Sequence, residues 1–184
     1  IARDNHRDTR DIFLRALKSD VIISTGGVSM GRYDFVGENL AGLKIEVLFD
    51  RVNVKPGSHL TFGRKGKKLF FSLPGKPVQT LTSFMEFVRP ALLKMMGANL
   101  INKPVVNAIL EEDVARRPGR AHLLMGRFTI KNNEFHVSIA KGERTSVMRS
   151  MSEANCLVLI PEKAAAIKAG EKVAIQLVDH GEIS

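Results

Sequence analysis

The sequence lacks the features that would assign it to a membrane or to the secretory pathway. It contains no run of 18 apolar residues, so no membrane-spanning segment is expected. The first residues are charged throughout and do not form the apolar core of a secretory signal. There is one cysteine, Cys156, which excludes a disulfide framework and predicts a reducing compartment, with the cytoplasm as the expected location.

Aromatic side chains are also scarce, with no Trp and one Tyr. Proteins that bind single-stranded nucleic acid usually stack bases on such side chains, so this class is not favoured. The formal net charge is nevertheless +9, of which residues 1–98 carry +7 and residues 99–184 carry +2. The imbalance suits an anionic partner, although the basic run at 64–68 is explained equally well as the solvated tip of a hairpin.

The order of patterns predicts two domains of different class. Residues 1–98 alternate between strand and helix, which indicates an α/β layer architecture. Residues 99–184 show five short apolar segments separated by turn-rich connectors, which predicts a small all-β barrel or sandwich. The chain begins with Ile rather than Met, so we expect it to be a piece of a longer protein.

Hydrophobic periodicity and turn residues place the elements of the first domain. We expect a helix over 8–18, a buried parallel strand over 20–25, a short helix over 34–43, a strand over 44–57, a hairpin over 59–73 that turns at Gly66, and a helix from Pro77 that kinks at Pro90 and stops at Gly97. The five expected strands of the second domain lie within 105–113, 121–130, 134–140, 155–161 and 172–179.

Three glycine-containing loops follow predicted strands in the first domain: STGGVSMGRYDF (24–35), VKPGS (54–58) and LPGKP (73–77). If the strands are parallel neighbours, the loops converge where open α/β sheets bind ligands. None of the loops has the spacing of a dinucleotide or Walker motif. Each loop is also consistent with a plain turn, and Asp34 with either a helix cap or a metal-facing carboxylate.

These segments carry a resemblance to a known family. DVIISTGGVSMGRYDF, VNVKPG and LPGKPVQTLTSF resemble successive signatures of the molybdopterin molybdenumtransferase family, which includes bacterial MoeA and the E domain of gephyrin. PGRAHLLMGRF and SVMRSMSEANCLVLIP resemble the C-terminal β-barrel domain of that family. The resemblance implies that 1–98 is the C-terminal half of a MogA-like, three-layer molybdopterin-binding domain and that 99–184 is the barrel.

The resemblance also implies an activity. Members insert molybdenum from molybdate into adenylylated molybdopterin, release AMP and require Mg²⁺, and the full-length protein is expected to be a homodimer. Such a reaction needs cradles for a phosphate and an oxyanion and carboxylates for the metal. The fragment alone is expected to be inactive.

Candidate site residues come from the three loops and from the matched motifs. The expected substrate-binding residues are Thr25, Gly26, Gly27, Ser29, Gly31, Lys55, Pro56, Gly57, Ser58, Pro74, Gly75, Lys76, Pro77, Arg120, Ser146 and Ser150, and the expected catalytic and metal-binding residues are Asp4 and Asp34.

Four residues depart from the family pattern at the rim of the site: Ser58, His59, Lys76 and Gln79. Two other functions stay open. A scaffold of the gephyrin type would use the same fold to hold receptors, and a basic nucleic-acid-binding module would rest on the net charge alone. A steep salt dependence of binding to nucleic acid would distinguish the second.

Overall fold

The computed structural model describes residues 6–26, 35–140 and 151–178. The backbone forms two compact units. The first, here called the α/β unit, comprises Ile1–Val52 and Gly57–Arg89, and the second, the β unit, comprises Asn53–Pro56 and Pro90–Ser184. The four residues Asn53–Pro56 therefore belong to the second unit, although the segments on both sides of them belong to the first.

The α/β unit contains a mixed four-stranded sheet with the order β1-β5-β4-β2. Its strands are β1 (Val21–Thr25), β2 (Glu46–Phe49), β4 (Thr61–Lys65) and β5 (Lys68–Leu73). β1 and β5 are parallel, as predicted for the first strand, whereas β4 runs antiparallel to both β5 and β2. The hairpin predicted over 59–73 is confirmed, with Gly66 at its turn in a positive-φ conformation (59°).

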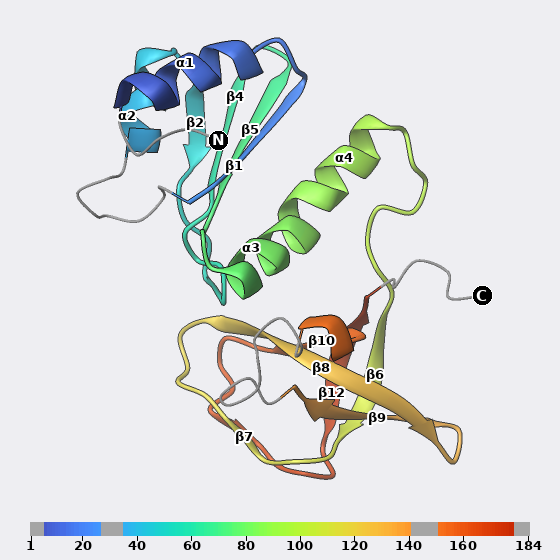
Figure 1. Cartoon of the computed structure of the whole chain (residues 1–184). Helices are drawn as coiled ribbons and strands as arrows, with labels where there is room; N and C mark the ends of the chain where they lie inside the picture. Colours follow the sequence, from blue (N-terminus) through green and yellow to red (C-terminus); the bar gives the residue numbers. More distant parts are fainter. Residues whose placement is uncertain (1–5, 27–34, 141–150, 179–184) are drawn as a thin grey trace. The chain divides into compact units, whose positions relative to one another are not determined.

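Two helices, α1 (His6–Ala16) and α2 (Phe35–Gly42), lie together over one face of this sheet (Figure 1). Both helices were predicted, and their apolar sides build one core with the strands. The ring of Phe13 meets the ring of Phe70 edge-on, with the centroids 5.3 Å apart. The buried members of this core are Phe13, Ile22, Leu40, Leu43, Ile45 and Phe70.

The prediction of a single strand over 44–57 is wrong. The segment contains β2 and then a separate two-residue strand, β3 (Val54–Lys55), which joins the sheet of the β unit. Apolar and polar residues alternate both over 45–47 and over 52–55, so the pattern alone does not reveal the change of sheet. The strand predicted over 20–25 is confirmed, but it is less buried than expected, because Ile23 is 41% exposed.

The helix predicted after Pro77 is confirmed as three consecutive elements: α3 (Pro77–Ser83), a π-helical turn, η1 (Phe84–Val88), and α4 (Arg89–Met95). The π turn ends two residues before Pro90, which lacks an N–H and crowds the carbonyl four residues earlier, at Glu86 within that turn. Gly97, at φ 73°, ends the helix as predicted. The expected apolar stripe is buried at Met85 and Val88 but exposed at Met95.

The β unit is built around a six-stranded sheet with the order β10-β12-β6-β9-β8-β3, and an additional pairing of β10 with β8 closes five of its strands into a barrel. All five predicted strands are confirmed. Their bounds are β6 (Val105–Leu110), β8 (Ala121–Lys131), β9 (Glu134–Ile139), β10 (Cys156–Ile160) and β12 (Lys172–Leu177); β7 (Val114–Ala115) and β11 (Ala166–Ile167) form a separate pair.

The barrel interior is apolar and includes the single cysteine. Leu110, Val137, Cys156, Val158 and Ile175 are each fully buried. Burial raises the pKa of the Cys156 thiol to about 12, so the group is a neutral core side chain rather than a nucleophile. The compact units divide between residues 89 and 90. The domain boundary predicted from the sequence, between 98 and 99, stays a prediction.

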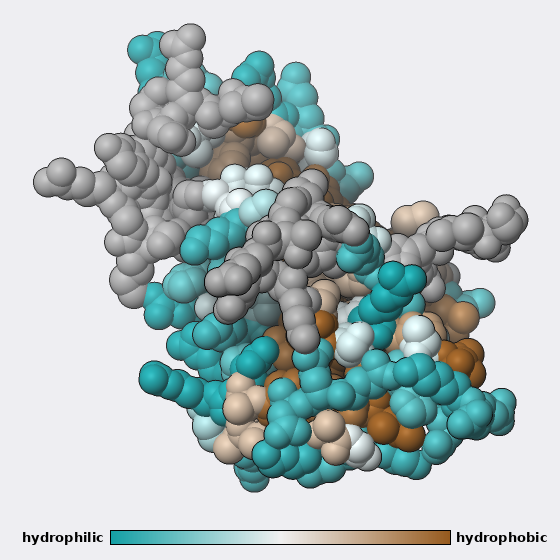
Figure 2. Space-filling model, turned by 60° about the horizontal axis from the view of Figure 1, so that its bottom comes forward, coloured by the Kyte–Doolittle hydropathy of each residue, from teal (hydrophilic) through white to brown (hydrophobic). Residues whose placement is uncertain are grey.

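The surface of the described residues is mainly hydrophilic on the face shown in Figure 2, with smaller hydrophobic patches among the hydrophilic residues. The most exposed apolar side chains are Met96 and Leu100, at 80% and 86%. Within the described ranges, no helix combines the length and the apolar character that crossing a bilayer would require.

Candidate functional site

Two of the three predicted loops meet at the carboxyl ends of the parallel strands β1 and β5. β1 and β5 are parallel neighbours, so the segments that follow them leave the sheet side by side. The amide of Gly26 donates to the carbonyl of Leu73 (2.9 Å). A Cβ on Gly75 would lie 3.3 Å from the Cα of Gly26. The first and third loops therefore converge at their starting points, as expected.

The second loop reaches the same region by a different route. Its strand, β3, pairs with β8 and not with the α/β sheet, so the expected parallel neighbourhood does not apply to it. Instead, buried Gly57 packs against α3, the helix that follows the third loop. A Cβ at Gly57 would lie 2.7 Å from Ser83 Oγ and 3.4 Å from the carbonyl oxygen of Gln79. Close backbone approach thus requires glycine here, where φ is +99°.

The turn before α3 has the predicted form. Lys76 is the N-cap residue in an extended conformation, with no side-chain capping hydrogen bond, and Pro77 occupies the first helical position. The hydroxyl of Thr80 donates to the carbonyls of Pro74 and Lys76 and so closes the turn. The side chain of Lys76 is exposed, and its role in binding an anion stays a prediction.

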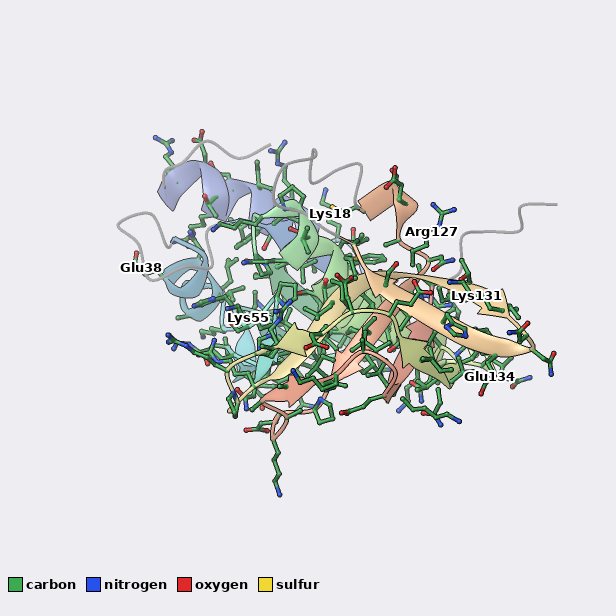
Figure 3. The ribbon with its side chains drawn as sticks, turned by 90° about the horizontal axis from the view of Figure 1, so that it is seen from below. Lys18, Glu38, Lys55, Arg127, Lys131 and Glu134 are labelled. Atoms are coloured by element: carbon green, nitrogen blue, oxygen red, sulfur yellow. The ribbon has the colours of Figure 1, made fainter. Side chains whose placement is uncertain are left out.

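The β unit contains a pocket of about 540 Å³ that we call the basic groove. It brings together two predicted residues from distant motifs, Lys55 and Arg120; Lys55 is labelled in Figure 3. None of the residues that line it is acidic. The lining comprises Lys55, Ala115, Arg116, Arg117, Pro118, Gly119, Arg120 and His122.

Sequence reasoning missed three cationic or titratable residues of this groove: Arg116, Arg117 and His122. The doublet Arg116-Arg117 is four positions before Arg120, and in sequence it looks like ordinary solvated charge. Lys55 of β3 and His122 of β8 are partners in the register of the two strands. Such partners project to the same face of a sheet. The ion pairs found within the described ranges involve neither Lys55 nor the three arginines.

Asn53 holds the wall of the groove in place. Its side-chain amide donates both to the carbonyl of Gly119 (3.0 Å) and to the carboxylate of Glu162 (2.9 Å). The amide of Gly119 in turn donates to the Glu162 carbonyl (2.9 Å), and the amide of Ala121 to the Asn53 carbonyl (3.2 Å). These bonds fix the segment that carries the three arginines to β3, and they keep Glu162 paired with Asn53.

The electrostatics of the groove are most visible at His122. Burial lowers the pKa of His122 below its usual value, and the nearby charges of Arg116, Lys55 and Arg120 lower it further. A hydrogen bond with the backbone of Arg117 acts in the opposite direction. At neutral pH the His122 ring is therefore uncharged while the groups around it are positive.

The other predicted site residues divide into two groups. Thr25, Pro56, Ser58 and Pro74 lie where the three loops leave their strands. Asp4, Gly27, Ser29, Gly31, Asp34, Ser146 and Ser150 lie outside the described residues. In the described part of the chain, no group of three or more His, Cys, Asp or Glu side chains could hold a metal ion.

We expect Asn53→Ala to weaken the groove without removing any of its charges. Two hydrogen bonds are lost, which lowers the free energy of unfolding by about 1–2 kcal/mol. The affinity for sulfate should also fall, because the arginine-bearing segment is no longer tied to β3. Thermal melting and calorimetric titration check both effects. Asn107→Ala, at an exposed position on β6, is the control, and equal behaviour of the two variants would contradict the assigned role.

Comparison with known proteins gives a consistent result for both units. Residues 1–94 match the family model described as a probable molybdopterin binding domain, and residues 107–178 match the MoeA C-terminal region, domain IV. The chain is 32% identical over 162 residues to the molybdopterin molybdenumtransferase of Staphylococcus aureus strain N315, covering 88% of this chain and 39% of the relative. The corresponding protein of Staphylococcus epidermidis strain ATCC 12228 is 28% identical over 180 residues, or 97% and 43% of the two chains.

Solved structures agree. The molybdopterin biosynthesis MoeA protein from Pyrococcus horikosii aligns with a TM-score of 0.77 and 25% identity, covering 96% of this chain and 42% of that one. A molybdenum cofactor biosynthesis protein from Pyrococcus furiosus aligns with a TM-score of 0.70 and 25% identity, covering 96% and 56%. The chain thus spans less than half the length of the curated relatives that it matches.

Proposed function

The chain belongs to the MoeA family, and from this membership we propose that it is the part of a molybdopterin molybdenumtransferase that contributes an oxyanion site to the reaction. The proposed reaction transfers molybdenum from molybdate to adenylylated molybdopterin and releases AMP. Since the chain spans 39% and 43% of the two relatives, the activity is proposed for the complete enzyme and not for these residues alone.

One observation carries the proposal: Lys55 and Arg120, from motifs far apart in the chain, line the same groove. An arginine presents a fixed fork of N–H donors to an oxyanion, and a lysine adds a compact charge. Arg116 and Arg117 raise the positive charge of the groove, and no acidic residue lines it. Such an arrangement favours a small multiply charged anion such as molybdate or a phosphate group.

Magnesium is part of the proposal through Asp4 and Asp34, the two carboxylates predicted to hold it. Bound Mg²⁺ would offset negative charge on the phosphate groups of the substrate. Both residues lie outside the described ranges, and within those ranges no group of three or more candidate metal ligands occurs. A metal titration of Asp34→Asn in the complete enzyme would test this part separately.

A homodimer and a cytoplasmic location complete the proposal. The dimer rests on family membership, and the location rests on a single cysteine that is buried and unpaired. The scaffold and nucleic-acid alternatives find no support among the relatives reported above, which are named for molybdopterin biosynthesis.

The proposal predicts that Lys55→Gln and Arg120→Gln each weaken molybdate binding about tenfold or more, because each removes one charge-assisted contact. Isothermal titration at constant ionic strength measures the affinity. Lys67→Gln is the matched control, since it removes the same charge from the exposed hairpin tip. If the groove variants bind molybdate as tightly as Lys67→Gln does, the groove is not the oxyanion site. In the complete enzyme the same two variants should lower molybdenum insertion.

A further inference from the structure

His122 is unusual among the buried polar residues of the described chain. The others are Asn39, Ser72, Thr82 and Ser83, none of which changes charge in the physiological range. His122 is only 6% exposed, yet it lines the basic groove beside exposed cations. A titratable ring is therefore held at the inner side of a site whose other charged groups are permanently positive.

Among the residues that the structure describes, the charged groups that act on the ring are all positive. Lys55 faces it from β3, and Arg116 and Arg120 face it from the segment that leads into β8. The Arg117 guanidinium also lines the groove, while the backbone of Arg117 hydrogen-bonds the ring. On the other side, β10 contributes Ile160, the strand partner of His122, which has no charge.

The hydrogen bond with the backbone of Arg117 determines which ring nitrogen of His122 can face a ligand. It favours the protonated ring, so the ring N–H donates and the Arg117 carbonyl oxygen accepts. A neutral imidazole then has one nitrogen left, which carries a lone pair and no proton. This second nitrogen cannot donate to an oxyanion until it is protonated.

An anion in the groove would reverse the balance of charge around the ring. Without ligand, burial first and then the three neighbouring cations hold the pKa of His122 below its usual value. A bound dianion opposes the cations and offers an acceptor, and both effects favour the protonated ring. Binding and protonation must then strengthen each other equally, because they are thermodynamically linked.

We propose that His122 makes anion capture in the basic groove proton-linked: the ring takes up one proton from solvent when a dianionic oxyanion binds and donates the new N–H to that anion. The inference rests on the proposed function only in taking the groove as an anion site. In this role His122 favours dianions that have an oxygen able to accept its new N–H. Lys55 and Arg120, in contrast, attract any anion through their permanent positive charge.

Sulfate is the probe, because it stays a dianion throughout the pH range in which a histidine changes charge and cannot serve as a source of molybdenum. Titration calorimetry of the intact protein in two buffers of different ionisation enthalpy counts the protons taken up. Between the titration midpoints of the ring with and without sulfate, we expect uptake of up to one proton and an affinity that rises by up to about tenfold per unit fall in pH; below the lower midpoint the affinity should level off. NMR of the His122 ring in the parent protein should show its titration midpoint rising when sulfate is added.

Two variants isolate the ring. His122→Gln can still donate to the Arg117 carbonyl but cannot titrate, so its sulfate affinity should lose the pH dependence assigned to the ring. His136→Gln, on β9 and away from the groove, should behave like the parent. Equal pH slopes in the parent and His122→Gln would overturn the inference, and the NMR midpoint decides the question if the variant does not fold.

The outcomes for the two proposals differ. Sulfate binding without proton uptake would overturn the role of His122 and leave the proposed transferase intact. Proton-linked sulfate binding together with a complete enzyme that inserts no molybdenum would support the role of His122 and count against the proposed function. A parent protein that binds no sulfate at any pH would overturn this inference, whereas molybdate binding by the same protein would keep the groove as an oxyanion site.

Discussion

Gly57→Ala is expected to lower the free energy of unfolding by about 2–4 kcal/mol, measured by urea denaturation. Two effects combine. The backbone at Gly57 has φ +99°, a conformation that L side chains rarely adopt, and the new Cβ would lie 2.7 Å from Ser83 Oγ. The backbone strain accounts for about 1–2 kcal/mol and the overpacking for the remainder.

The two effects can be separated with variants that the chain itself offers. Gly66→Ala, at φ +59° with no atom within 4 Å of the new Cβ, carries only the backbone effect and should lose about 1 kcal/mol. Adding Ser83→Ala to Gly57→Ala relieves the closest contact and should restore part of the loss. If Gly57→Ala destabilises no more than Gly66→Ala, the loop does not need its close approach to α3.

The elements with strong periodicity were predictable from sequence, and the reasons are local. The helix α1, the hairpin at Gly66 and the five barrel strands each have an apolar pattern of the right period and a turn residue at the end. The stop at Gly97 follows from the same logic, since a glycine can take the positive φ that ends a helix. Such signals are contained within each segment and do not depend on the partner.

The change of sheet at β3 was not predictable, because its cause lies elsewhere in the chain. A strand of two residues is too short to show a periodic pattern, and its partner strand is β8. The hydrogen bond beside this pairing joins Asn53 to the carbonyl of Gly119, 66 positions later in the chain. The basic groove follows from this one pairing. Lys55 and Arg120 were predicted as separate candidates, and only the β3–β8 contact places them in the same pocket.

The same pairing explains why His122 was missed. In sequence, Ala121-His122-Leu123 begins an ordinary amphipathic strand, in which a histidine is expected on the solvated face. The structure buries it to 6% exposure beside β3 and the arginine-bearing segment. By contrast, the convergence of the first and third loops was predictable, since parallel neighbouring strands place their following loops together.

Phe70→Ala is expected to produce the largest loss of stability, about 3–5 kcal/mol, in the α/β unit. Phe70 is 1% exposed, lies at the centre of the core that joins β5 to α1, and makes an edge-on contact with Phe13. Truncation removes this contact and leaves a cavity that the surrounding strands and helices cannot fill. Urea denaturation followed by circular dichroism measures the loss, and Phe70→Leu, which keeps most of the volume, should cost less.

The same variant tests whether the basic groove is a property of the β unit alone. All the residues that line the groove belong to Asn53–Pro56 or to Pro90–Ser184, and none contributes to the core around Phe70. Under conditions where Phe70→Ala is still folded, its affinity for sulfate should therefore equal that of the parent. A loss of stability below about 1 kcal/mol would contradict the core role of Phe70, and a changed sulfate affinity would show that the groove depends on the α/β unit.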